Sequence, residues 1–241
     1  MTKKNLLGSA SEDYLKAIYD LRAEDGVVTT TELAAAMRVS AASTTNMIKK
    51  LAALKLVRHS PYYGVELTPA GEKIALEVVR HHRLIESFLH EALGVPWDEV
   101  HAEAHKLEHV LSDNLEDHIA DFLGNPTEDP HGDPIPTKAG SIVAFDQQSL
   151  AELEPGARAT IRRIGAQDPE RLRYLRGLGL IPKANVSLID HAPFQGPVRV
   201  RVANGDEHSL DHSLAQQIWV SKVSKATARK QPGKHRREAR A

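Results

Sequence analysis

Apolar residues recur at helical spacing through most of the first 123 residues, interrupted by short polar segments. Ser9–Glu12 has the S-x-x-E form of a capping box and predicts a first helix that runs to about Glu24. Thr29–Glu32 is a second such box and predicts a short helix, and Ser40 predicts the N-cap of a third helix. Two short helices joined by a tight turn are typical of a helix-turn-helix.

A short alternating pattern follows the third predicted helix. Leu56–His59 and Gly64–Leu67 flank the turn sequence Ser60–Tyr63, which predicts a β-hairpin. A hairpin placed directly after a helix-turn-helix is typical of a wing. Residues 1–73 are therefore predicted to form a winged helix-turn-helix DNA-binding domain.

Helical periodicity returns after the hairpin. Thr68–Pro69 predicts an N-cap with proline at the first helical position of a long helix. The next predicted helix carries apolar residues from Val100–Leu115, and a further short helix is expected to end near Leu123. Residues 124–140 are rich in proline and glycine, so they predict a linker or a docked loop. We therefore expect a helical domain with its linker over residues 74–140.

From about Ala144 the pattern changes to strand-length apolar runs separated by proline, glycine and Asn-Gly turns. Asn204–Gly205 suits a tight hairpin, and Pro169–Gly177 predicts one short helix. Residues 141–223 are thus predicted to form a small β-barrel, at the end of a chain that is otherwise mainly α. Residues 224–241 are polar and basic without periodicity, which predicts a disordered tail.

Charge and histidine are concentrated in the predicted helical domain. Residues 74–140 hold 4 basic and 14 acidic residues and eight of the 13 histidines, whereas the last 20 residues hold 8 basic residues and one acidic residue. Carboxylates mixed with imidazoles suit a divalent cation, and a chain of 241 residues without cysteine must build a metal site without thiolate. No apolar run approaches the ~18 residues that span a bilayer, so we expect a cytoplasmic protein that does not enter the membrane.

The potential metal ligands have helical spacing. Four of them fall at i, i+4, i+7 and i+8 on one face of a predicted helix: His101, His105, Glu108 and His109. The preceding helix adds an i, i+4 pair, His82 and Glu86. A single such residue is usually a solvated surface group, but six at ligand spacing predict a cation site.

Two other interpretations of the histidines stay open on this pattern. His105–His109 matches H-x-x-E-H, a zinc hydrolase signature in which two histidines bind zinc and the glutamate is the base. A hydrolase leaves the helix-turn-helix unexplained, so we rank it lower and expect no enzyme. The third interpretation is a metal-independent winged-helix regulator whose histidines only pack.

Taken together, these segments resemble the diphtheria toxin repressor and manganese transport regulator family of metal-dependent transcriptional repressors. The likeness rests on the winged helix and on four sequence segments: Ser11–Leu15, His81–Glu86, Val100–Val110 and His131–Pro136. The remainder to about residue 223 resembles the SH3-like third domain of the family, and Leu178–Pro182 resembles the related ferrous-iron-transport small domain.

The resemblance implies two metal sites. Its primary site would use Asp13, His105, Glu108 and His109, and its ancillary site would use His82, Glu86 and His101. Lys16 stands where one manganese-sensing branch has a second carboxylate, which favours the arrangement of the three-domain relatives. The third domain offers Gln167 and Asp168 as further candidate ligands. Oxygen and imidazole donors without sulfur suit Mn(II), our first expectation, or Fe(II), although zinc and nickel bind such ligands more tightly.

The resemblance also implies a partner, double-stranded DNA. The third predicted helix would present Ala42, Ser43 and Asn46 to base edges in the major groove. Phosphate contacts are expected from Lys49, Lys50 and the wing residue Arg58. We therefore expect a cytoplasmic homodimer, joined through the middle helices, that binds a near-palindromic operator with metal as co-repressor and represses metal uptake genes.

Overall fold

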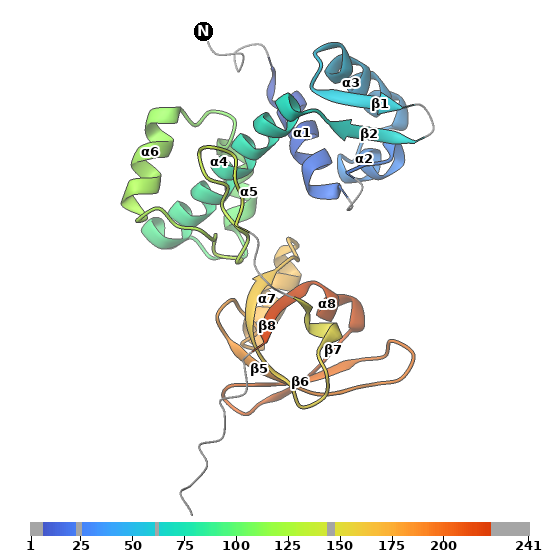
Figure 1. Cartoon of the computed structure of the whole chain (residues 1–241). Helices are drawn as coiled ribbons and strands as arrows, with labels where there is room; N and C mark the ends of the chain where they lie inside the picture. Colours follow the sequence, from blue (N-terminus) through green and yellow to red (C-terminus); the bar gives the residue numbers. More distant parts are fainter. Residues whose placement is uncertain (1–6, 23–25, 61–62, 144–147, 223–241) are drawn as a thin grey trace, which may run out of the picture.

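The computed structural model describes residues 7–22, 26–60, 63–143 and 148–222. The predicted tail at 224–241 and part of the predicted wing turn, residues 61–62, lie outside the described residues. Three packed units follow one another, with the N-terminal unit at one end of the molecule and a strand-rich unit at the other (Figure 1). Each unit buries an apolar cluster, and the cluster of the strand-rich unit also includes Trp97 of the middle unit.

The N-terminal unit has the winged helix-turn-helix order that the sequence predicts. Thr29 forms the predicted capping box with Glu32, and the Ser40 side chain caps the third helix. The first helix differs from the prediction, because its N-cap is Gly8 without a side-chain cap and it ends at Leu21. The elements are α1 (Ser9–Leu21), α2 (Thr30–Ala36), α3 (Ala41–Ala53), β1 (Val57–Ser60) and β2 (Gly64–Leu67).

The middle unit is built on one long helix. It starts with the predicted Thr68 cap and Pro69, crosses the expected domain boundary at residue 73, and ends at Leu93. Gly94 caps it with a φ of 70°, which is favourable for glycine. The single helix predicted through Leu115 is wrong, because Ser112 caps a separate helix. The elements are α4 (Pro69–Leu93), α5 (Val100–Leu107) and α6 (Asp113–Phe122). Among the described residues, no helix is both long and apolar enough to cross a bilayer.

The strand-rich unit holds one antiparallel six-stranded sheet in the order β3-β8-β4-β5-β6-β7. The predicted helix and the strands on either side of Asn204–Gly205 are present. Among the described residues the edge strands β3 and β7 do not pair with each other, so the predicted barrel is not closed by strand pairing. The elements are β3 (Gln148–Ser149), η2 (Leu150–Glu152), β4 (Arg158–Ile164), α7 (Pro169–Gly177), β5 (Asn185–His191), β6 (Val198–Val202), β7 (Glu207–Leu210), α8 (His212–Gln216) and β8 (Ile218–Lys222).

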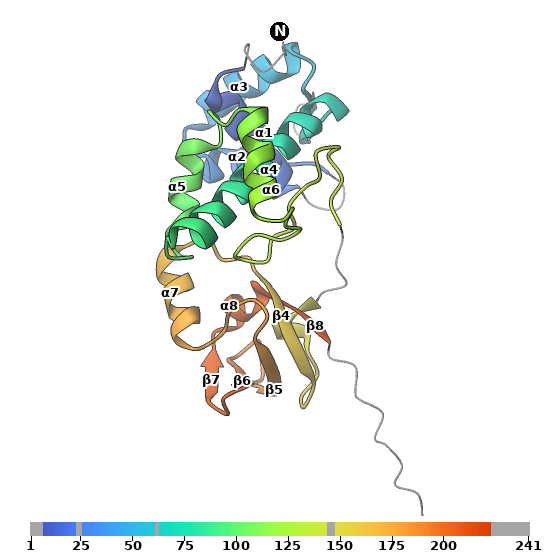
Figure 2. The same cartoon turned by 90° about the vertical axis from the view of Figure 1, so that its left-hand side faces the viewer.

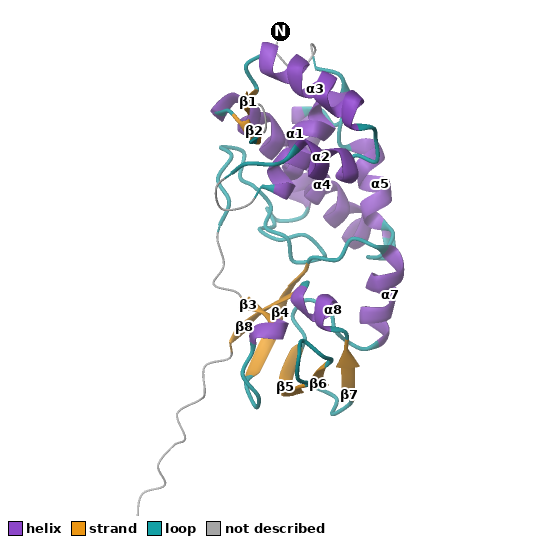
Figure 3. Ribbon diagram, turned by 90° about the vertical axis from the view of Figure 1, so that its right-hand side faces the viewer, coloured by secondary structure: helices purple, strands orange, loops and turns teal. Residues whose placement is uncertain are grey.

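The strand-rich unit is docked on the middle unit at two places. The proline-rich loop lies against β4: the Ile164 N–H donates to the His131 carbonyl at 2.9 Å, and a Cβ on Gly132 would meet the Arg162 carbonyl oxygen at 1.8 Å. Helix α7 lies beneath α5 in both side views (Figure 2 and Figure 3), and Arg173 pairs with the buried Asp98 at 3.1 Å. The segment predicted as a linker or a docked loop is therefore docked where it meets β4.

Candidate metal centre

Four of the predicted ligands come together from two units. Asp13 projects from α1 of the N-terminal unit, while His105 lies on α5 and Glu108 and His109 follow the end of that helix. One side-chain ligand atom from each residue lies within 4.8 Å of those from the other three. The four residues are separated by up to 96 positions in the chain, so the packing of α1 against the middle unit creates the group.

The His109 ring is held by two carboxylates of α1. Its Nδ1 lies 2.7 Å from Oε2 of Glu12, and its Nε2 lies 2.8 Å from Oδ1 of Asp13 and 3.4 Å from Oε1 of Glu108. The hydrogen bonds to Asp13 and then Glu12 raise the pKa of His109 to about 9. In metal-binding histidines, one ring N–H commonly donates a hydrogen bond to a carboxylate, and the other ring nitrogen faces the remaining metal ligands. His109 has this arrangement. Glu12 is a functional candidate that the sequence analysis missed.

Glu108 is the buried centre of this group. Its Oε1 lies 2.8 Å from Nδ1 of His105, and its Oε2 lies 2.8 Å from Nζ of Lys16 and 2.5 Å from Nδ1 of His82. Burial alone would raise the pKa of Glu108, but the hydrogen bond from His82 and the charge of Lys16 hold it at about 2. The carboxylate is therefore ionised at any physiological pH.

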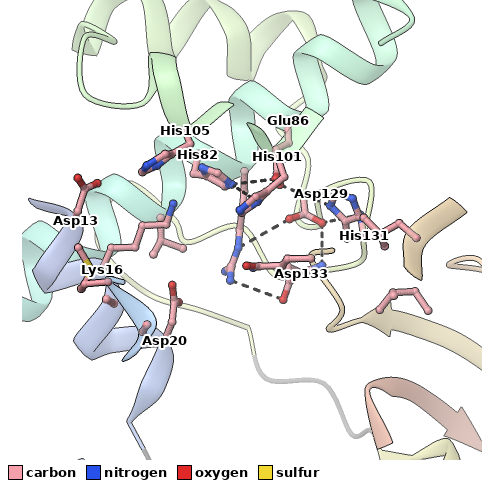
Figure 4. Close-up of a pocket in the computed structure, with 18 of the residues that line it drawn as sticks. Asp13, Lys16, Asp20, His82, Glu86, His101, His105, Asp129, His131 and Asp133 are labelled. Atoms are coloured by element: carbon pink, nitrogen blue, oxygen red, sulfur yellow. Dashed lines mark hydrogen bonds and ion pairs between the residues drawn. The ribbon is translucent and has the colours of Figure 1, made fainter. Parts of the chain in front are cut away.

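The other three predicted ligands form a second group beside the first. Oε1 of Glu86 lies 2.9 Å from Nε2 of His82 and 3.0 Å from Nδ1 of His101, and Figure 4 shows the three side chains converging. Because the opposite nitrogen of His82 contacts Glu108, one imidazole joins the two groups. Of the four candidate ligands that share helical spacing, His101 lies in this second group, and α5 ends at Leu107, before Glu108 and His109.

A cavity of about 310 Å³ opens beside both groups and is lined by all three units. Asp13 and Lys16 line it from α1, His82 and Glu86 from α4, and Gln167 from the strand-rich unit. Asp168, the other third-domain candidate, instead accepts hydrogen bonds from the N–H groups of the first turn of α7.

The predicted DNA-contacting residues lie on α3 and the wing, at the end of the molecule opposite the strand-rich unit (Figure 3). All six are exposed: Ala42, Ser43, Asn46, Lys49, Lys50 and Arg58. Two of the cations already have partners, since Nζ of Lys50 donates to Oγ of Ser11 at 3.1 Å and Arg58 pairs with Glu66 across the wing at 3.1 Å.

Three protein-family models match the chain in succession. They are the iron dependent repressor N-terminal DNA binding domain over residues 6–65, the iron dependent repressor metal binding and dimerisation domain over 68–137, and the FeoA domain over 148–222. The iron-dependent repressor IdeR of Mycobacterium tuberculosis is 31% identical over 231 residues, which cover 91% of this chain and all of that protein. The chain belongs to the diphtheria toxin repressor and manganese transport regulator family.

As a member of that family, the chain is a metal-dependent transcriptional repressor, with a DNA-binding domain followed by a metal-binding and dimerisation domain. A solved manganese-dependent transcriptional repressor in complex with manganese is similar to it with a TM-score of 0.82 and 38% identity, covering 88% of this chain and all of the other. A structure of the repressor ScaR with bound Cd²⁺ has a TM-score of 0.77 and 34% identity, over 88% of this chain and 99% of that one. Relatives named for iron and for manganese both occur, and nothing supports the zinc hydrolase.

Proposed function

We propose that this repressor is activated by Mn(II), acts in the cytoplasm as a homodimer on near-palindromic operators of metal uptake genes, and has no enzymatic activity. The single observation that carries the proposal is the group formed by Asp13, His105, Glu108 and His109, because it draws its ligands from two units. The proposal includes the division of the chain at residues 73, 140 and 223, with a small SH3-like barrel as the third domain.

The chemistry of the donors supports manganese. The first group offers two carboxylates and two imidazoles, and the chain has no cysteine to supply a soft thiolate. Hard oxygen donors with imidazole suit Mn(II), and Fe(II) is the alternative of the same family. The ring of His109 is already oriented by Glu12, so these residues fit a resident divalent cation.

The position of Asp13 supports a coupling between metal and DNA. A divalent cation supplies the positive charge that these carboxylates and imidazoles would share when it is bound. Asp13 lies on α1, whose Leu15 and Ile18 pack in one core with Ile48 of α3. A cation held jointly by Asp13 and the ligands of the middle unit would therefore fix the orientation of α3, because α1 and α3 share this core. Because a ligand shifts a conformational equilibrium only through differential affinity, donors that converge in one arrangement of the two units favour that arrangement.

The surface of the middle unit supports a homodimer. Large apolar side chains that are at least 42% exposed lie on all three of its helices and on the turn between α5 and α6: Leu93, Leu107, Val110, Leu115 and Phe122. Several exposed apolar side chains on one unit are typical of a surface that binds another protein.

The DNA contacts follow from the exposed side of α3. Ala42, Ser43 and Asn46 are small, so direct base readout is modest and Asn46 is the principal polar reader. Lys49, Lys50 and Arg58 supply contacts to phosphates, which add affinity and salt dependence without sequence choice.

The proposal is tested by fluorescence anisotropy of labelled promoter fragments taken from upstream of this gene and of neighbouring metal transporters. The labelled DNA is titrated first with protein that has been freed of metal by a chelator, and then with protein that has been loaded with Mn(II), anaerobic Fe(II) or Zn(II). We expect DNA binding only with metal and most tightly with Mn(II). This binding should be abolished in Glu108→Gln and retained in the control Glu103→Gln, an exposed carboxylate on α5 five residues earlier in the chain. Tight binding by chelated protein contradicts metal activation, and stronger activation by Fe(II) favours the iron-responsive alternative.

A further inference from the structure

We propose that Glu86, Asp129 and His131 form a third cation site, which shares Glu86 with the His82–Glu86–His101 group. The inference rests on the proposed metal-binding function of that group. The three residues are all buried, and one ligand atom from each lies within 4.8 Å of the other two. Figure 4 shows Asp129 and His131 beside each other and next to Glu86.

His131 is oriented to be a ligand. Its Nε2 lies 2.7 Å from the carbonyl oxygen of Trp97, so this nitrogen carries the hydrogen and donates it. The other ring nitrogen, Nδ1, faces Oε2 of Glu86 at 3.8 Å and would offer its lone pair once the ring is in the neutral form that a cation requires. That separation is too long for a hydrogen bond but matches two ligand atoms on one cation, which lie about 3 to 4.5 Å apart when each bond is about 2.0–2.3 Å. The backbone carbonyl acts as the outer partner that metal-binding histidines usually have.

Asp129 turns one oxygen into the fold and leaves the other available. Its Oδ1 accepts the backbone N–H groups of His131 at 2.8 Å and of Asp133 at 2.9 Å. Its Oδ2 faces the Nε of Arg83 at 3.9 Å, and no hydrogen bond to Oδ2 is present within the described residues. Arg83 instead donates from Nη1 to the carbonyl of Pro134 at 2.5 Å. This buried oxygen has only the long ion pair with Arg83 and accepts no hydrogen bond from the described residues, so it can still coordinate a cation.

Glu86 is placed to bridge the two sites. Its Oε1 contacts His82 and His101, whereas its Oε2 faces His131. The His82–Glu86–His101 group has two imidazoles and one carboxylate, while the third site has two carboxylates and one imidazole. The third site therefore has the harder donor set of the two, and this donor set suits Mn(II).

The site would also connect the units. Asp129 and His131 belong to the loop that β4 holds through the hydrogen bond from Ile164, and Glu86 lies on α4. A cation shared by the loop and α4 fixes the strand-rich unit to the helix that carries the other ligands. This gives the third domain a role in metal sensing that does not require it to supply a ligand of its own.

The test counts Mn(II) bound to the full-length protein by equilibrium dialysis with elemental analysis, and records the Mn(II) EPR spectrum of the saturated protein. Two variants should preserve the fold. Asp129→Asn keeps an oxygen that accepts the backbone N–H groups of His131 and Asp133, and His131→Gln keeps a donor for the Trp97 carbonyl. Asp133→Asn is the matched control, because this carboxylate of the same loop pairs with Arg163 at 3.2 Å and belongs to none of the three groups.

We expect three ions per chain and a spin-coupled manganese pair in the wild type and in Asp133→Asn, and two ions without coupling in Asp129→Asn and His131→Gln. Two ions in the wild type, or three in both variants, overturn the third site and leave the two-site function intact. Fewer than two ions in the wild type contradict the proposed function itself.

Discussion

Nζ of Lys16 lies 2.8 Å from Oε2 of Glu108, so an ammonium group of α1 contacts the buried carboxylate at the centre of the first ligand group. Lys16 follows Asp13 by one helical turn, and both side chains point to the same part of the middle unit. The same helix therefore carries both the proposed ligand Asp13 and a positive charge that would compete with the cation.

Replacing Lys16 should strengthen metal binding. Lys16→Gln removes a positive charge near the first group, and removing the repulsion between two charges a few ångströms apart should tighten Mn(II) binding by about tenfold. Competition with a calibrated chelator measures the effect. Lys106→Gln, which removes an exposed charge paired with Glu103, should leave the affinity unchanged. Equal or weaker affinity in Lys16→Gln would show that the ammonium supports Glu108 and does not compete with the cation.

Glu12 should matter although it is not a predicted ligand. Glu12→Gln weakens the hydrogen bond that orients His109, and loss of such an outer partner typically costs about 10- to 100-fold in metal affinity. Calorimetric titration with Mn(II) measures it. The far-UV circular dichroism spectrum should stay unchanged. An affinity within about twofold of the wild type would assign Glu12 a purely structural role.

Metal affinity should increase with pH up to about 9. The pKa of His109 is raised to about 9 by Asp13 and Glu12, and a cation requires the neutral ring. Binding at pH 7 must therefore release at least one proton, and the affinity falls as the pH decreases. Calorimetry in buffers of different ionisation enthalpy counts the released protons. Release of none at pH 7 would contradict the assignment of His109 as a ligand.

Glu116 should stabilise the middle unit independently of metal. Its carboxylate lies 2.5 Å from Nε of Arg80 and 3.1 Å from Nε2 of His81, and although burial opposes ionisation, these partners hold its pKa at about 2. Glu116→Gln should lower the free energy of unfolding by about 2 to 3 kcal/mol at pH 7 in urea titrations. Because the folded pKa lies below the ordinary value of 4.5, the difference should shrink as the pH falls from 4.5 toward 2. The exposed control Glu103→Gln should change stability by less than about 0.5 kcal/mol.

The elements that the sequence predicts well are those specified by local chemistry. Thr29, Ser40 and Thr68 each satisfy backbone N–H groups within three residues, so the starts of α2, α3 and α4 can be read from the chain. The false extension of α5 shows the limit, because apolar periodicity continues from Val100 to Leu115 across the break. Ser112 was the signal that could have revealed the new helix.

The candidate site could be predicted in its residue types but not in its connections. Spacing finds His82 with Glu86, and it cannot show that His82 also contacts Glu108, 26 residues away. Glu12 fits a capping box locally, yet its side chain is buried against His109, 97 residues further on. The orientation of His131 depends on the Trp97 carbonyl, which only the tertiary structure brings near.

The central claim is that Asp13 couples metal binding to DNA binding, and the most direct measurement compares wild type with Asp13→Asn in operator anisotropy titrations with and without Mn(II). Asp20→Asn, the same change on the same helix but outside the ligand groups, is the control. We predict that Mn(II) raises the DNA affinity of the wild type and of the control by about 100-fold and that of Asp13→Asn by less than about fivefold, with unchanged folding and dimerisation. Full activation of Asp13→Asn by Mn(II) would contradict the account.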